Sequence, residues 1–86
     1  MPKVKNYANT LEECAKIAKE RQAQYGEATK SIKLATDILR DAFGVDLTPR
    51  EFVLTIIALK LSRQKFQEKD DNMLDTINYL AIYLNL

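Results

Sequence analysis

Acidic and basic side chains lie close together in residues 60–79, at positions where a helical pattern predicts burial. Lys60 and Arg63 continue the apolar stripe of one predicted helix, and Asp71 and Asp75 lie one helical turn apart near the start of the next. Buried charges are costly unless they are paired with one another or hold an ion or a ligand. We therefore predict that this segment carries the function of the protein.

The two aspartates support two interpretations. Carboxylates one turn apart project from the same side of a helix and can share Mg²⁺, a cation that prefers oxygen ligands. Asp71 and Asp75 are therefore candidate metal ligands. The alternative is structural: Asp71 caps its helix, and Asp75 pairs with Lys60 or Arg63 across the hairpin.

Three basic residues are candidate phosphate ligands. Lys60 and Arg63 lie one turn apart, and Arg21 lies within the apolar stripe of an earlier predicted helix. Arg21 either extends along the core with its guanidinium in water or forms a buried pair. Tyr25 and Tyr79 are candidates for stacking on a base, with filling of the core as the alternative role.

Length and composition narrow the classes of function. The chain has 86 residues, a formal charge of +1, one cysteine and no histidine. Zinc fingers, Cys-His nucleophile pairs and Ser-His-Asp triads are thereby excluded, and Cys14 has no partner for an internal disulfide. The near balance of charge gives no strong signal for nucleic acid, and no stretch is apolar enough for a membrane span. We expect a soluble cytoplasmic protein.

The positions of these residues depend on four predicted helices. Capping boxes begin the first helix at Thr10 and the third at Thr48, and Gly26 and Gly44 end the first two. With no alternating run long enough for a strand, we predict an all-α, compact four-helix domain over residues 10–86, preceded by a flexible arm at 1–9. The helices are expected at about 10–25, 28–43, 49–67 and 71–84.

Two of the predicted helices have distinct roles as scaffold and as interface. The helix over 28–43 separates its apolar and charged sides cleanly, so we predict a scaffold without a site. The helix over 49–67 carries Leu54 and Leu61 on a second apolar side, and an 86-residue chain has little surface of its own to cover them. We therefore expect a homo-oligomer, either a dimer or a higher assembly.

The order of motifs resembles a small, largely uncharacterised family of bacteriophage and prophage proteins. The residues that carry this resemblance are RQAQYG at 21–26, FGVDLTPREF at 43–52, KLSR at 60–63 and DNMLDTINYL at 71–80. The resemblance implies a location in the host cytoplasm.

The D-x-x-x-D-x-x-x-Y pattern also looks like the last metal-binding helix of the MazG-like all-α nucleoside triphosphate pyrophosphohydrolases. That similarity implies a helical bundle, Mg²⁺, oligomerisation, Asp71 and Asp75 as metal ligands, and Lys60 and Arg63 as phosphate contacts. The chain departs from those enzymes at their E-x-x-E pair, because Glu12 and Glu13 are adjacent here and Lys16 stands where the second glutamate is needed.

Three functions are consistent with these features. One is a Mg²⁺-dependent hydrolase of nucleoside triphosphates, in which the aspartates hold the metal. Another is a non-catalytic protein that binds, and so sequesters, a nucleotide or signal nucleotide through its basic residues. The third is a structural or interaction oligomer whose inward charges fix the register of the bundle. Whether the protein is an enzyme is left open by the sequence.

Overall fold

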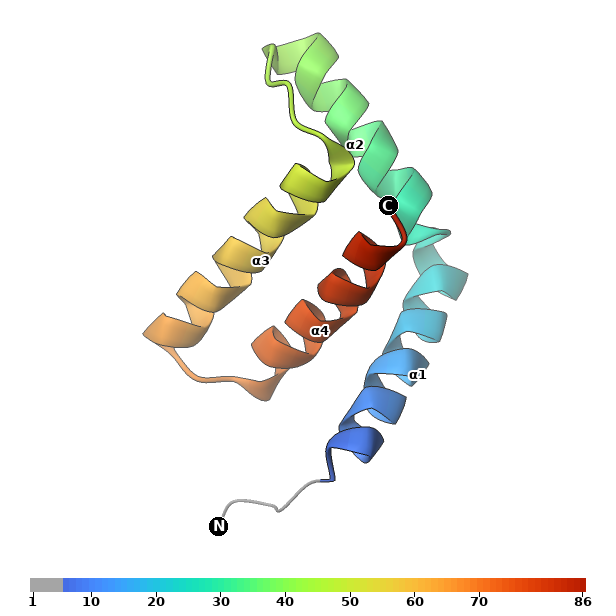
Figure 1. Cartoon of the computed structure of the whole chain (residues 1–86), viewed down its shortest axis with the longest axis vertical. Coiled ribbons are helices and arrows are strands. Elements are labelled where there is room, and N and C mark those ends of the chain that lie inside the picture. The colour runs from blue at the N-terminus through green and yellow to red at the C-terminus, as the bar shows by residue number, and fades with distance from the viewer. Residues whose placement is uncertain (1–5) are drawn as a thin grey trace.

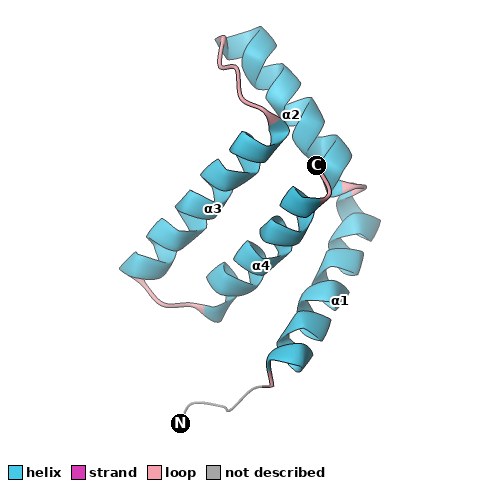
Figure 2. Cartoon of the chain, viewed as in Figure 1, coloured by secondary structure: helices cyan, strands magenta, loops and turns pink. Residues whose placement is uncertain are grey.

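The computed structural model describes residues 6–86, and within that range it consists of four helices without strands. Their bounds are Tyr7–Tyr25 (α1), Ala28–Phe43 (α2), Pro49–Phe66 (α3) and Asp70–Leu84 (α4) (Figure 2). The predicted all-α class is confirmed. Among the described residues, no helix has both the length and the apolar composition needed to cross a membrane.

The helices form a row that is closed at one end by α2. In Figure 1, α3 and α4 make a hairpin, α1 lies along the other side of α4, and α2 crosses above. α4 packs against both α3 and α1, and α2 packs against α3. α4 is therefore the central helix, and its residues can reach both neighbours.

Local signals in the sequence set most of the helix ends. The Thr48 hydroxyl accepts a hydrogen bond from the Glu51 backbone N–H at 3.1 Å, and the Glu51 carboxylate accepts one from the Thr48 N–H at 3.0 Å. The predicted capping box of α3 is thus formed. Gly44 ends α2 in the left-handed conformation, and Gly26 ends α1 with a φ of +80°.

The start of α1 differs from the prediction. The helix begins at Tyr7, because the Asn6 side chain accepts a hydrogen bond from the Ala8 N–H at 2.8 Å and acts as the cap. Thr10 is therefore inside the helix, and residues 6–9 do not belong to a flexible arm. The rest of the predicted arm, residues 1–5, lies outside the described residues. Smaller corrections apply to α3, which ends at Phe66, and α4, which begins at Asp70.

The Gln64 side chain holds the turn between α3 and α4. Its Oε1 accepts hydrogen bonds from the Lys69 backbone N–H at 2.9 Å and from Asn72 Nδ2 at 3.1 Å. Lys69 is the N-cap residue of α4, so the alternative in which Asp71 caps this helix is wrong. Asp71 instead lies in the first turn, where a carboxylate interacts favourably with the positive end of the helix.

The core is small. Among residues 6–86, the buried hydrophobic residues are Cys14, Ile32, Val53 and Ile57. The last three form one cluster with partly buried side chains from α3, α4 and the C-terminus, which are Phe52, Tyr79, Ile82, Tyr83 and Leu86. Cys14 joins α1 to α4 separately, with its Sγ 3.9 Å from the Leu74 carbonyl oxygen.

Several large apolar residues on α1 and α2 are exposed. Leu11 and Tyr25 on α1 are 53% and 76% exposed, and Ile38 and Phe43 on α2 are 52% and 73% exposed. The physical reason lies in the arrangement: α1 packs mainly against α4, and the far half of α2 extends past the end of the row (Figure 1). One apolar side on each of these two helices therefore lacks a neighbour within the part of the chain that the structure describes.

Candidate functional site

Asp75 on α4 is the centre of the charged segment. Its Oδ1 lies 3.0 Å from Arg21 Nη2, and its Oδ2 accepts a hydrogen bond from Lys60 Nζ at 2.8 Å. The Asp75 and Lys60 side chains are 16% and 18% exposed, whereas the Arg21 side chain is 50% exposed. One carboxylate thus joins α1, α3 and α4, and Arg21 both pairs with it and reaches solvent.

The candidate phosphate ligands are not all brought together. Arg21 and Lys60 meet at Asp75, but Arg63 lies one turn beyond Lys60 on an exposed part of α3. Arg63 lines neither of the two hollows described below. The pairing of Asp75 with Lys60 was one of the two structural alternatives expected from the sequence, and the pairing with Arg63 is not observed.

The smaller hollow, of about 360 Å³, holds both candidate metal ligands. It lies between α1 and α4, and its polar lining is Glu20, Arg21, Gln24, Asp71 and Asp75. Within residues 6–86, however, no three acidic or sulfur-bearing side chains come close enough together to hold a metal ion. Both Asp75 oxygens are also engaged by cationic side chains. In this conformation Asp75 is therefore held by ion pairs on both of its oxygens.

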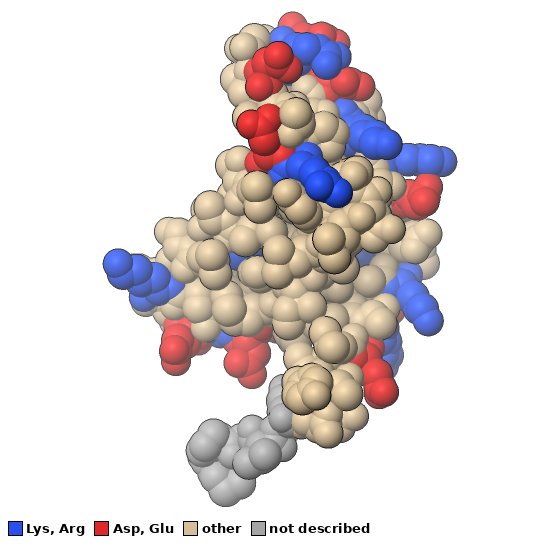
Figure 3. All heavy atoms as spheres, in the orientation of Figure 1, with Lys and Arg blue, Asp and Glu red and all other residues tan. Residues whose placement is uncertain are grey.

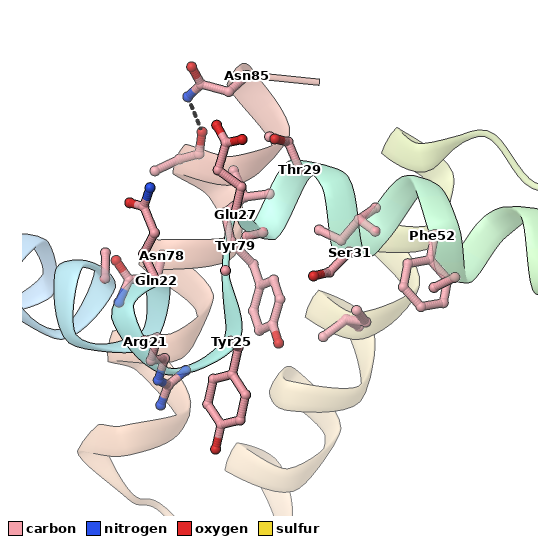
Figure 4. A pocket seen from close by; sticks show the side chains of 18 residues that line it. Arg21, Gln22, Tyr25, Glu27, Thr29, Ser31, Phe52, Asn78, Tyr79 and Asn85 are labelled. Carbon is pink, nitrogen blue, oxygen red and sulfur yellow. Dashed lines mark hydrogen bonds between the residues drawn. The ribbon is translucent and has the colours of Figure 1, made fainter.

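The larger hollow is a groove of about 700 Å³ on the other side of Arg21. Figure 4 shows the side chains that line it, contributed by the end of α1, the start of α2, and parts of α3 and α4. Arg21, Tyr25 and Tyr79, three residues selected from the sequence, all belong to this lining. Tyr79 also packs against the core cluster, whereas the Tyr25 ring is largely exposed.

The start of α2 gives the groove a positive end. Glu27 is the N-cap residue but its side chain makes no capping hydrogen bond, so the first backbone N–H groups of α2 lack that partner. Ala28 and Thr29 line the groove there. The Glu27 carboxylate, which also lines the groove, pairs with Lys30 at 3.4 Å. Uncapped N–H groups at a helix start favour an anion.

Asn78 lines the same groove, and its amide nitrogen is a buried donor without a partner among the described residues. Its Nδ2 atom is buried and has no hydrogen-bond partner among the described residues, although a buried amide normally has one. Asn78 follows Asp75 by about one turn of α4, and near the end of this helix Asn85 donates to the Ala81 carbonyl oxygen at 2.9 Å (Figure 4). The groove thus combines aromatic rings, a guanidinium and an amide.

Sequence reasoning missed the contribution of α2. We predicted a pure scaffold helix, but its first turn lines the groove through Ala28, Thr29 and Ser31. The missed signal is the absence of a good N-cap: Glu27 stands where Ser, Thr, Asp or Asn is usual. The sequence alone also did not show that the Asn78 amide nitrogen lacks a partner.

Comparison of the chain with curated proteins and with solved structures returned no match. A family model does match, over residues 9–86. This range includes both hollows and all four helices, apart from the first two residues of α1. The chain therefore belongs to the family DUF6378, a domain of unknown function.

Proposed function

We propose that the protein binds a nucleotide, or a signal molecule built from nucleotides, in the groove at the junction of α1, α2 and α4. The observation that carries this proposal is the position of Arg21. Arg21 lines both a groove that contains two tyrosines and a hollow that contains two aspartates. A base would stack on the Tyr79 or Tyr25 ring, and Arg21 and the start of α2 would hold the phosphates.

The ion pairs favour binding without chemistry over hydrolysis. Lys60 and Arg21 neutralise Asp75 in the folded chain, so this carboxylate is not free to act as a metal ligand. An anionic phosphate near Arg21 would compete with Asp75 for the guanidinium, which is half exposed and can turn toward either partner. Sequestering a nucleotide needs no second acidic pair.

Calorimetry with ATP, AMP, adenosine and pyrophosphate tests this proposal. We expect ATP to bind, adenosine to bind more weakly, and Arg21→Ala to weaken ATP binding about tenfold or more, because a charge-assisted contact is lost. Arg40→Ala is the matched control, since Arg40 pairs with Asp37 at 3.0 Å near the far end of α2. Absence of binding heat with all four compounds would rule the proposal out.

A nucleoside triphosphate pyrophosphohydrolase is the second candidate. One observation favours it: Asp71, Asp75 and Glu20 line a single hollow beside Arg21. A bound triphosphate could bring Mg²⁺ with it, because its phosphate oxygens supply ligands that the protein lacks. Release of pyrophosphate from ATP, GTP, CTP or UTP, abolished in Asp71→Asn, would support this function over simple binding.

A further inference from the structure

The described chain exposes more surface than a compact chain of its mass. Its accessible surface is 6795 Å², whereas about 5200 Å² is expected for a folded protein of 9.9 kDa. Five residues the size of residues 1–5 contribute at most about 850 Å² of accessible surface. When this amount is subtracted, the surface still exceeds the expected value by at least about 700 Å². A standard protein interface buries about 800 Å² on each partner, so the excess is close to one such interface.

One side of α4, the central helix, has no packing partner among the described residues. α4 packs against α3 on one side and α1 on another, yet none of its residues is fully buried. Its exposed leucines are Leu80 and Leu84, one turn apart. A helix in the middle of a row normally contributes to the core, so a third side of α4 lacks a neighbour among residues 6–86.

The neighbouring helix continues the same apolar face. At about 100° per residue, Leu54 and Leu61 lie on one side of α3, nearly opposite Phe52, which lines the groove. By the same geometry, Leu80 and Leu84 lie on the side of α4 away from Asn78 and the groove. Because α3 and α4 are antiparallel, these two leucine pairs share one face of the hairpin, which we call the leucine face.

The distribution of charge matches that of an interface. In Figure 3 the middle of the molecule over α3 and α4 is almost free of charged side chains, whereas acidic and basic side chains lie around its edge. An apolar centre with a charged rim is the usual anatomy of a protein interface. Both signs are present at the rim, and the formal charge of +1 creates little repulsion between two copies.

We propose that the leucine face binds the leucine face of a second copy of this chain, so that two α3–α4 hairpins form a four-helix core. The occupant must be present whenever the chain is folded, because the four buried hydrophobic residues found within 6–86 make a small core for a free-standing domain. Another copy of the chain meets that requirement. A symmetric contact of one face with itself also closes the assembly as a dimer.

The groove remains open in this dimer. Phe52, Asn78 and Arg21 lie on the side of the hairpin away from the leucine face, so each copy presents its own groove to solvent. The dimer does not depend on the proposed function, and it predicts two independent ligand sites per assembly.

Light scattering coupled to gel filtration tests the dimer. At micromolar concentration we expect the wild-type protein to have twice the chain mass of 9.9 kDa. The double variant Leu54→Glu, Leu61→Glu places two carboxylates in the centre of the contact and should run as a monomer. Leu59→Glu is the matched control: Leu59 and Leu61 are on the same helix and both are 50% exposed, but they point to opposite sides.

Thermal melting of the wild type provides a second measurement that does not depend on the variants folding. The melting temperature of a dimer rises with protein concentration, because association stabilises only the folded state. A wild-type monomer, or a melting temperature that is constant over a hundredfold range of concentration, overturns the proposal. Dissociation by Leu59→Glu with retention of the dimer by the double variant would also overturn it.

Discussion

Asp75 joins three helices through two ion pairs, and its removal should weaken the fold. In Asp75→Asn, Lys60 keeps its charge in a site where its side chain is 18% exposed, and Arg21 loses its partner. An unpaired charge in a partly buried site is destabilising, so we expect a loss of about 2 kcal/mol in the free energy of unfolding. Chemical denaturation of the parent and the variant measures this loss.

Asp41→Asn is the control for this prediction. Asp41 pairs with Arg40 at 3.3 Å, but both side chains are more than half exposed, and exposed pairs contribute little. Mg²⁺ provides a further comparison. If Mg²⁺ raises the melting temperature of the parent and Asp75→Asn does not lower the apo stability, the carboxylate is a metal ligand and the ion-pair interpretation is wrong.

Asn78 offers a test that separates stability from binding. Its buried Nδ2 has no partner among the described residues, so replacing the amide by an apolar group of similar shape removes an unsatisfied donor. We expect Asn78→Leu to be as stable as the parent or more stable, and to bind ATP as tightly as the parent, because a donor without accessible surface does not contact a ligand in the groove. Unfolding and calorimetry on the same samples check both parts. A clear loss of stability would mean that the amide has a structural role.

At the scale of the element, α3 carries the strongest local signal in the chain. Thr48→Ala removes the oxygen that accepts the Glu51 N–H, and the loss of such a cap costs about 1 kcal/mol. Ser31→Ala, at an exposed position in α2, is a control that removes a hydroxyl from inside a helix, away from the cap. The free energy of unfolding measured in urea distinguishes the two. Equal effects would show that the capping box does not stabilise the fold.

The capping box also predicts a dependence on pH. Hydrogen bonds from the Thr48 backbone and side chain lower the pKa of the Glu51 carboxyl from its ordinary 4.5. A carboxyl with a depressed folded pKa stabilises the fold above its unfolded pKa, and this contribution is lost as the pH falls through the lower folded value. Stability should therefore fall more steeply between pH 5 and about 3 in the parent than in Glu51→Gln. Parallel pH profiles of the two proteins would contradict this.

The elements that were predictable are those with local causes. Thr48, Pro49 and Glu51 specify the start of α3 within four residues, and Gly44 specifies the end of α2, so the sequence was sufficient there. The start of α1 was misplaced because two caps compete within four residues, and Asn6 forms the one observed. A capping pattern shows that a helix start is favourable without showing which of two adjacent starts forms.

The residues of the site were predictable from the sequence, but the ion pairs between them were not. Helical periodicity placed Lys60 and Asp75 on inward sides, as observed, whereas the Arg21 side chain is half exposed. The pairing of Arg21 with a residue 54 positions later depends on how α1 packs against α4. The exposure of Tyr25 follows from the same packing. Periodicity describes one helix at a time, whereas the groove is formed by four.

At the scale of the whole molecule, α1 is the helix least secured by the core. The cluster of Ile32, Val53 and Ile57 involves α2 and α3, and its partly buried neighbours come from α3, α4 and the C-terminus. Among the described residues, α1 has one buried side chain, that of Cys14, and its link to Asp75 is half exposed. Segments with few buried contacts open locally at lower free energy than the core.

Hydrogen exchange should therefore divide the chain in two. In the free protein we expect the backbone amides of α1 to exchange faster than those of the middle of α3, since α1 can separate from α4 without disturbing the core cluster. A nucleotide in the groove would contact the end of α1, the start of α2 and α4 together, and binding to the closed form alone would slow exchange in α1. Mass spectrometry of peptides from residues 7–25 and 49–66, with and without ATP, measures both effects.

Arg21→Ala should remove the protection by ATP, with fast exchange in α1 unchanged. If α1 exchanges as slowly as α3 in the free protein, the groove is rigid before any ligand binds, and the ordering of α1 by ligand is excluded.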